Sequence, residues 1–227
     1  MAKILYATDE DIALRASADF AILCPRDQKL ASGVDGLFDS SDRWTLRSPS
    51  VDFASQGLMP GHVVQLLGPS AIFRPPGESL IVVHCDGFGV TLRRRGQSVG
   101  SGQPPAPVGG FLGVEFAITT LAPQIEQASF EIDRRLGISD FHAGRQASDL
   151  MDPRELRELV VLTVLHRQYM DMSRGAGGAS QDALAVKAQL IKIELDELLA
   201  RTAIHWRTVV EGIGDEPTTR FCSRISR

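Results

Sequence analysis

The fold is decided by residues 80–94, which read LIVVHCDGFGVTLRR. Two apolar, β-branched runs, Leu80 to His84 and Val90 to Arg94, flank the turn-forming link Asp86-Gly87-Phe88-Gly89. Strand-forming residues on both sides of a short glycine-containing link are typical of a β-hairpin. This stretch therefore predicts two antiparallel strands.

Further strand signals surround this hairpin. Val63 to Leu67 is a compact apolar run between Pro60-Gly61 and Gly68-Pro69, and Trp44 to Leu46 is a shorter one. Gly113 to Thr119 supplies a last strand after a linker rich in proline and glycine. Short strands at this spacing predict a small antiparallel β-barrel or sandwich.

Helical patterns stand on both sides of the strand-rich segment. Thr8 precedes three acidic residues, so its hydroxyl can cap a helix that we expect to continue to Cys24 and to stop at Pro25. Residues 27–42 are polar and rich in glycine and aspartate, which predicts a loop.

Three longer helices are predicted after the strands. The first starts at Leu121 behind Thr120 and ends at Gly137, the second starts behind Asp152, and the third follows the glycine-rich turn 174–179. Short connections make neighbouring helices antiparallel.

We therefore expect an α+β fold: a helical bundle with an inserted small antiparallel β-barrel or sandwich domain and an extended C-terminal tail. The expected boundaries are 1–43 for the N-terminal helix and loop of the helical scaffold, 44–119 for the β-domain, 120–211 for the bundle and 212–227 for the docking tail.

The composition is that of an ordinary globular protein, with 43% hydrophobic and 23% charged residues. A formal charge of -4 gives no general attraction to nucleic acid. The three cysteines, Cys24, Cys85 and Cys222, are far apart, which argues against a disulfide framework and a cysteine zinc site. We expect no signal peptide, no membrane span, and reduced thiols in a cytoplasm.

One catalytic pattern occurs. Residues 96–100, GQSVG, fit G-x-S-x-G, but the following SGQPP cannot begin the helix that a nucleophile elbow needs. We interpret this segment as a turn and keep as an alternative a hydrolase that uses Ser98 with His142 or His166 as base. A second alternative is a monomeric module whose strands bind a small ligand or peptide. Otherwise we expect no catalytic residue, no cofactor and no metal site, because no histidine stands in a zinc-binding pattern.

Two basic segments are candidate contact sites. Arg93-Arg94-Arg95 is the only dense basic run, with Arg93 and Arg95 on one face of a strand and Arg94 on the other. It is either a solvated strand edge or a ring or channel contact. The last residues, 218–227, read TTRFCSRISR and alternate like a strand. A lone strand is unstable, so we expect this tail to dock on a partner.

Several segments together resemble neck-region proteins of tailed phages. They are DF at 52–53 with QGLMPGHVV at 56–64, VTLRR at 90–94, GSGQPP at 100–105, TLAPQIE at 120–126 and TTRF at 218–221. The helical part, 121–200, is similar in layout to the head–tail connector (portal adaptor) proteins of siphophages, which are small helical bundles that form a ring beneath the portal.

The resemblance implies a non-enzymatic virion structural protein without a cofactor. It would form a ring, a dodecamer, under the portal protein, extend the DNA channel and give the next neck or tail protein a platform. Genomic DNA would pass without sequence-specific binding, and the protein would be assembled in the host cytoplasm without contact to a membrane. The strand-rich segment departs from the smallest adaptors, so a head-closure or tail-terminator role is the alternative. The tail residues that would bind the portal are Thr218, Thr219, Arg220, Phe221, Ser223, Arg224, Ile225 and Arg227.

Overall fold

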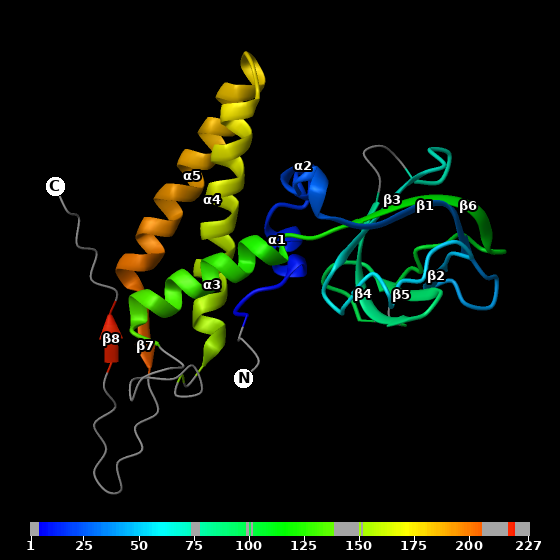
Figure 1. The fold of residues 1–227 in the computed structure, drawn as a ribbon, viewed down its shortest axis with the longest axis horizontal. Coiled ribbons are helices and arrows are strands. Elements are labelled where there is room, and N and C mark those ends of the chain that lie inside the picture. Colours follow the sequence, from blue (N-terminus) through cyan, green and yellow to red (C-terminus); the bar gives the residue numbers. More distant parts are fainter. Residues whose placement is uncertain are drawn as a thin grey trace, which may run out of the picture. The chain divides into compact units, whose positions relative to one another are not determined.

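The chain divides into two compact units (Figure 1). The computed structural model describes residues 5–73, 78–98, 100, 102–138, 150, 152–205 and 218–220. Residues 8–122 belong to the first unit, the barrel unit. Residues 1–7 and 123–227 belong to the second, the helical unit.

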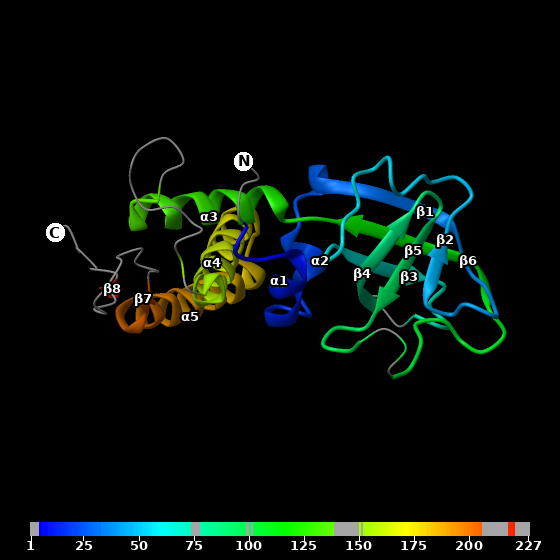
Figure 2. The same ribbon diagram turned by 90° about the horizontal axis from the view of Figure 1, so that it is seen from below.

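Six antiparallel strands close into a barrel in the order β1-β2-β5-β4-β3-β6 (Figure 2). The last strand closes it, because β6 pairs with both β1 and β3. The predicted hairpin is confirmed: it consists of β4 and β5. Of the two architectures that the sequence left open, barrel and sandwich, the structure has the barrel. The strands are β1 (Lys29–Phe38), β2 (Thr45–Arg47), β3 (Val63–Gly68), β4 (Glu78–Asp86), β5 (Gly89–Arg93) and β6 (Phe111–Thr119).

The barrel interior is filled by apolar side chains from all six strands and from the segments between them. Within this core, the rings of Phe53 and Phe116 contact each other with 5.7 Å between their centroids and an interplanar angle of 51°. Offset aromatic contacts of this kind add to the free energy gained by burial. The other large, fully buried side chains of this core include Phe38, Leu46, Leu66, Phe73, Leu80 and Leu92.

The loop predicted for residues 27–42 is wrong, because most of it is the ten-residue strand β1. Two glycines misled the prediction. A Cβ on Gly33 would lie 2.8 Å from the Phe116 ring, and one on Gly36 would lie 2.8 Å from the carbonyl oxygen of Val114. Glycine is required where β1 and β6 approach this closely, and the pairing register shifts at both positions. The barrel therefore begins at Lys29, before the predicted boundary at residue 44.

The N-terminal helix begins where expected but is divided. Thr8 and Asp11 form a reciprocal capping box at the start of α1 (Asp9–Arg15), which confirms the predicted cap. The single helix expected up to Cys24 is wrong. Ala16 leaves the helical region with φ of -120° and ψ of 51°, and a separate short helix, α2 (Phe20–Leu23), follows. A 3₁₀ turn at Arg26–Gln28 then leads into β1.

The described residues of the helical unit form three long helices and a small sheet. Its elements are α3 (Ala122–Leu136), a 3₁₀ turn η3 (Pro153–Leu156), α4 (Arg157–Gly175), α5 (Ala179–Arg201), β7 (Ala203–His205) and β8 (Thr218–Arg220). The predicted terminal signals are confirmed: Thr120 Oγ1 accepts from the Ala122 amide, Gly137 adopts a positive φ, and Asp152 accepts from the Arg154 amide. The turn between α4 and α5 makes these helices antiparallel neighbours (Figures 1 and 2).

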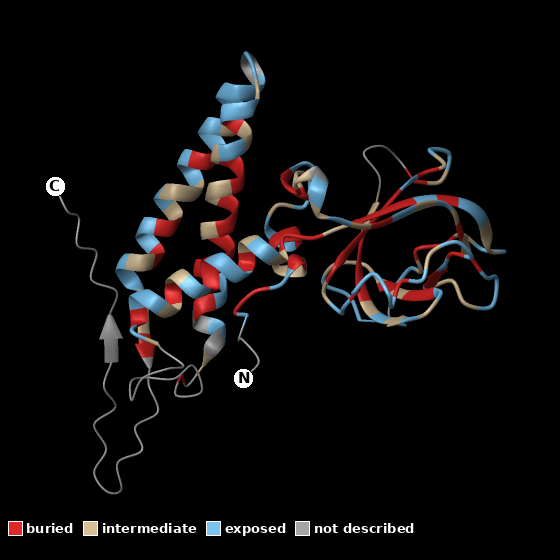
Figure 3. Ribbon diagram, in the orientation of Figure 1, coloured by how far each residue is buried: buried red, intermediate tan, exposed pale blue. Residues whose placement is uncertain are grey.

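Among the helices of the helical unit, α4 has the most buried side chains, and it is red along much of its length in Figure 3. Its buried apolar side chains are Leu159, Val160, Val161, Leu162, Val164, Leu165 and Tyr169. By contrast, among the α5 residues whose burial the structure describes, three apolar side chains are buried: Ala188, Leu195 and Leu198. The fold is thus mixed α and β, with a closed antiparallel barrel and helices outside it.

Candidate functional site

The basic run at the end of β5 is engaged inside the barrel unit. Arg93 donates from Nη2 to both carboxylate oxygens of Glu10, at 2.5 and 2.6 Å, and from Nη1 to the Gln97 carbonyl at 3.1 Å. The Arg93 and Glu10 side chains remain 21% and 19% exposed. A guanidinium that reaches both oxygens of a carboxylate is a strong, directional contact. Arg93 therefore fastens α1 to the barrel.

The other two arginines also bind groups of this unit. Arg94 pairs with Glu78 on β4 at 3.0 Å and donates to the Gln103 carbonyl at 3.2 Å. Arg95 donates to the Ala13 carbonyl of α1 at 2.9 Å. Burial raises the pKa of Glu78, and the charges of Arg94 and Arg95 oppose this shift. All three arginines are half-buried, and their role as ring or channel contacts stays a prediction.

An open cleft of about 710 Å³ lies in the barrel unit, next to these arginines. Gln65 of β3 is only 6% exposed, and its Nε2 has no hydrogen-bond partner in the described structure. A buried amide N–H without an acceptor is unfavourable, so the cleft is a candidate site for a small polar ligand or peptide. It is lined by Leu14, Ser17, Ala18, Ala21, Gln65, Ile72, Phe73, Glu78, Ser79, Arg94 and Arg95.

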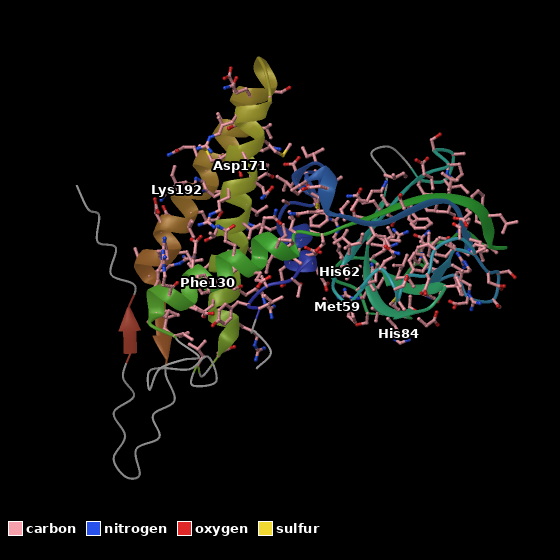
Figure 4. The ribbon with its side chains drawn as sticks, viewed as in Figure 1. Met59, His62, His84, Phe130, Asp171 and Lys192 are labelled. Carbon is pink, nitrogen blue, oxygen red and sulfur yellow. The ribbon has the colours of Figure 1, made fainter. Side chains whose placement is uncertain are left out.

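A smaller cavity of about 340 Å³ lies between α3, α4 and α5 of the helical unit. Two ion pairs border it: Arg167 of α4 with Glu131 of α3, and Lys192 with Asp196 along α5. Burial lowers the pKa of His166 beside them, and the neighbouring positive charges of Lys192 and Arg167 lower it further. Figure 4 shows Lys192 on α5, apart from Phe130 on α3 and Asp171 on α4. The contact between Arg167 and Glu131 connects α4 to α3 across this cavity.

Ser98, the nucleophile of the hydrolase alternative, lies in the connection between β5 and β6. The next regular element after it is a strand, so the described part of this connection lacks the helix that a nucleophile elbow requires. His166 belongs to the other unit, and His142 is outside the described residues. The serine thus has the pattern of an elbow without its strand-to-helix setting.

The two histidines of the barrel unit are one buried and one exposed side chain. His62 is 7% exposed, its Nδ1 accepts from the Met59 amide at 3.1 Å, and burial lowers its pKa. His84 is exposed on β4 (Figure 4). Among the residues that the structure describes, no group of three or more His, Cys, Asp or Glu side chains is placed to hold a metal ion.

The predicted docking tail is described only in part. Thr218–Arg220 is strand β8, and it pairs antiparallel with Ala203–His205 of the same chain. The remaining predicted contact residues lie outside the described part of the chain; they are Phe221, Ser223, Arg224, Ile225 and Arg227.

Comparison with protein-family models, with curated proteins and with solved structures finds no match to this chain. None of the described helices combines the length and the apolar character needed to cross a lipid bilayer.

Two features were missed by sequence reasoning. The cleft joins Leu14 of α1 to Gln65 of β3, and no local pattern signals a contact between residues so far apart. The second feature is a row of exposed apolar side chains on α5: Val186, Leu190 and Ile193 are 58%, 61% and 47% exposed. Its spacing was visible in the sequence, because residues that recur at intervals of four and three share one helix face.

Proposed function

We propose that this chain is a structural protein of a tailed-phage virion, a head–tail adaptor that forms a ring under the portal protein. The ring, a dodecamer, extends the DNA channel and provides the platform for the next neck or tail protein. The proposal starts from the sequence resemblance to neck-region proteins, and it includes no catalytic role and no cofactor. The protein is assembled in the host cytoplasm and resides at the head–tail interface, without a membrane partner.

The observation that carries the proposal is the pairing of β8 with β7. In the described part of the chain this sheet has only two strands. Two strands alone are marginally stable, and their outer edges present backbone N–H and C=O groups to which a further strand can add. A C-terminal ribbon of this kind supports docking on the portal through Thr218, Thr219 and Arg220, continued by Phe221, Ser223, Arg224, Ile225 and Arg227.

The proposal also requires the helices to form the bundle of a ring subunit. The row of buried side chains on α4, its antiparallel packing with α5, and the pair Arg167–Glu131 to α3 support a bundle centred on α4. The net charge of -4 fits a channel through which DNA passes, because strong binding of phosphates to the wall would impede its movement. In this setting Arg93, Arg94 and Arg95 remain the candidate ring or channel contacts.

The test is co-assembly with the cognate portal. Purified portal rings are mixed with the full-length chain or with a chain truncated after Asp215, and native mass spectrometry gives the number of copies bound. Twelve copies of the full-length chain and few or none of the truncated chain would support the adaptor role and the docking tail. Far-UV circular dichroism of the truncated chain checks that its helices and barrel are still folded.

A matched variant separates strand pairing from mere chain length. Thr219→Pro removes a backbone donor from β8 and should abolish portal binding, whereas Ser55→Ala, an exposed position of the barrel unit, should leave it unchanged. If the full-length chain does not bind, the portal-adaptor proposal is wrong.

Two observations favour other roles strongly enough to be tested in the same series. The closed barrel is an addition to the nearly all-helical layout of the smallest adaptors, and it favours a head-closure or tail-terminator position. Binding to a lower neck protein in place of the portal would support that position. The cleft with its unsatisfied Gln65 favours a monomeric binding module, which a monomeric mass and retention of a specific ligand would establish.

A further inference from the structure

The open cleft of the barrel unit has a polar side that the barrel itself provides. Gln65 alternates along β3 with Val64 and Leu66, whose side chains belong to the barrel core, so the Gln65 side chain points out of the barrel. Ser79 is the direct partner of Gln65 across β3 and β4, and it precedes the core residue Leu80. Both polar side chains therefore lie on the outer surface of the barrel, where they line the cleft.

The other side of the cleft is mostly apolar. Leu14 of α1, Ala18 and Ala21 of α2 line it, and Leu14 is 51% exposed. Ile72 and Phe73, in the segment after β3, add further apolar surface. The volume of about 710 Å³ is that of pockets which hold small ligands, about 300–1,000 Å³. A molecule that fills this cleft therefore needs an apolar part as well as a polar part.

Gln65 indicates what the polar part must be. Its side chain is only 6% exposed, and its Nε2 has no acceptor among the described residues. A buried N–H group without an acceptor costs free energy, and native proteins rarely contain one. The last side-chain torsion of glutamine is broad, so a turn of the terminal amide directs Nε2 to an acceptor in the cleft that Gln65 lines. The ligand must therefore supply a hydrogen-bond acceptor.

The charged side chains that line the cleft indicate that the acceptor is an anion. Arg94 is paired with Glu78 at 3.0 Å. Arg95 donates from Nη1 to the Ala13 carbonyl oxygen at 2.9 Å, which is a neutral partner. The described lining thus holds two positive charges and one negative charge. A single negative charge on the ligand balances them, whereas a second one would be repelled by Glu78.

We propose that this cleft binds a monocarboxylate that carries an apolar group. The carboxylate accepts from Gln65 Nε2 and from the Arg95 guanidinium, and the apolar group packs against Leu14 and Ile72. Guanidinium and carboxylate groups match in geometry, and their charge-assisted hydrogen bonds are stronger than neutral ones. Two kinds of molecule carry this chemistry: a free alkyl carboxylic acid and a peptide with an apolar C-terminal residue. The inference concerns the barrel unit alone and does not rest on the adaptor role.

Isothermal titration calorimetry of the full-length chain with octanoate at pH 7.5 tests the proposal. A ligand of this size should bind with a Kd on the order of 0.1–1 mM. Octanamide has the same shape without the charge, and octyl phosphate carries about two negative charges. Both should bind about tenfold or more weakly than octanoate.

Two substitutions test the polar contacts. Gln65→Leu removes an amide whose Nε2 has no partner, so thermal unfolding should show no loss of stability, whereas octanoate should bind about fivefold more weakly. Gln56→Leu, the same change at an exposed position of the barrel unit, should leave the affinity unchanged. Arg95→Gln should weaken octanoate binding about tenfold and leave octanamide binding unaffected.

Filling the cleft tests its location. Ala21 is exposed on α2 and lines the cleft, so Ala21→Phe should reduce octanoate binding without removing a buried side chain. Ile22, the next residue, is 54% exposed and is not among the described lining residues. Ile22→Phe is therefore the matched control and should bind octanoate like the wild type.

Two peptides identify the source of the carboxylate: acetyl-Gly-Gly-Leu with a free carboxylate, and the same peptide as its C-terminal amide. Tighter binding of the carboxylate peptide than of octanoate would assign the cleft to a peptide C-terminus, and the reverse order would assign it to a free acid. Either result supports the inference, provided that the amide peptide binds more weakly than its acid.

Three results would overturn the inference. They are no binding of any carboxylate at about 10 mM, equal binding of octanoate and octanamide, and an octanoate affinity that Gln65→Leu and Arg95→Gln leave unchanged. Portal binding is measured separately. A chain that binds the portal but no carboxylate would therefore refute this inference alone, and one that binds octanoate but no portal would refute the adaptor role alone.

Discussion

The carboxylate of Asp9 accepts a hydrogen bond from the backbone amide of Leu121 at 2.8 Å, across 112 positions of sequence. Asp9 is in the first turn of α1, and Leu121 is in the connection from β6 to α3. Asp9 is 3% exposed, and its second oxygen has no hydrogen-bond partner in the described structure. One buried carboxylate thus joins the start of the barrel unit to its end.

The burial of Asp9 predicts that the stability of the folded chain depends on pH in an unusual way. Burial raises the pKa of Asp9 to about 6, although hydrogen bonds from Thr120 and Leu121 oppose the shift. The folded chain therefore retains a proton that the unfolded chain loses, and the stability contributed by this proton disappears as the pH rises through 4 to 6. Asp9→Asn keeps the acceptor for Leu121 and removes the titration. The free energy of unfolding of the variant relative to wild type should rise between pH 4 and pH 7 by on the order of 1–3 kcal/mol.

Urea unfolding at several pH values measures this difference. His62, whose pKa is lowered by burial, contributes with the opposite sign, but it is present in both proteins and cancels. A difference that does not change with pH would show that Asp9 is ionised in the folded chain at its ordinary pKa.

The close approach of β1 to β6 predicts a severe cost for one methyl group. Gly36→Ala would place a Cβ 2.8 Å from the Val114 carbonyl oxygen and 3.0 Å from Leu46. Neither backbone nor core can move freely there, so the loss of stability should be about 1–3 kcal/mol. Gly87→Ala, in the turn between β4 and β5, meets only Asp52 at 4.0 Å and serves as the control. Thermal unfolding of both variants checks the prediction, which equal losses would contradict.

The contact between Phe53 and Phe116 predicts that shortening the Phe116 side chain greatly reduces the stability of the barrel. Phe116 is 1% exposed, and Phe116→Ala should reduce the free energy of unfolding by about 3–5 kcal/mol. Phe88, 58% exposed in the β4–β5 turn, offers the matched change, and Phe88→Ala should shift stability by less than about 0.5 kcal/mol. Denaturant titration followed by tryptophan fluorescence measures both. Comparable losses in the two variants would mean that Phe116 is not at a packed centre.

The thiols should differ in reactivity. Burial raises the pKa of the Cys24 thiol to about 12; the Thr119 side chain opposes this shift, and the Asp9 charge adds a smaller rise. Cys85 is only half-buried. Because the thiolate is the reactive form, a maleimide at pH 7.5 should modify Cys85 well before Cys24 in the folded chain, and both at similar rates in urea. Peptide mapping by mass spectrometry distinguishes the sites, and rapid labelling of native Cys24 would contradict its burial.

Local chemistry explains which elements the sequence predicts. The β4–β5 hairpin follows from its glycine-containing turn, and the starts of α1 and α3 follow from Thr8 and Thr120, because these signals act over a few residues. The composition of β1 misled the prediction, since Gly33 and Gly36 resemble a loop until Phe116 is placed against them. Their role depends on a strand that comes about eighty residues later.

The candidate sites also differ in whether they depend on local sequence signals or on contacts between distant residues. Arg93 was singled out as a basic residue, but its partner Glu10 is 83 residues away and carries no motif. The cleft at Gln65 depends on the placement of α1 and α2 beside β3, which no periodicity encodes. The outer row of α5 is purely local, and the spacing of Val186, Leu190 and Ile193 could have revealed it.

The closing strand sets an order of events during synthesis. Because β6 pairs with β1 on one side and β3 on the other, the barrel cannot close until Thr119 has left the ribosome. Until then, β1 can pair only with β2, and the hydrogen bond from the Leu121 amide to Asp9 cannot form. Contacts between residues so distant in the chain form slowly. The barrel unit is complete at residue 122, so it can fold as nascent chain while the helices are still being made.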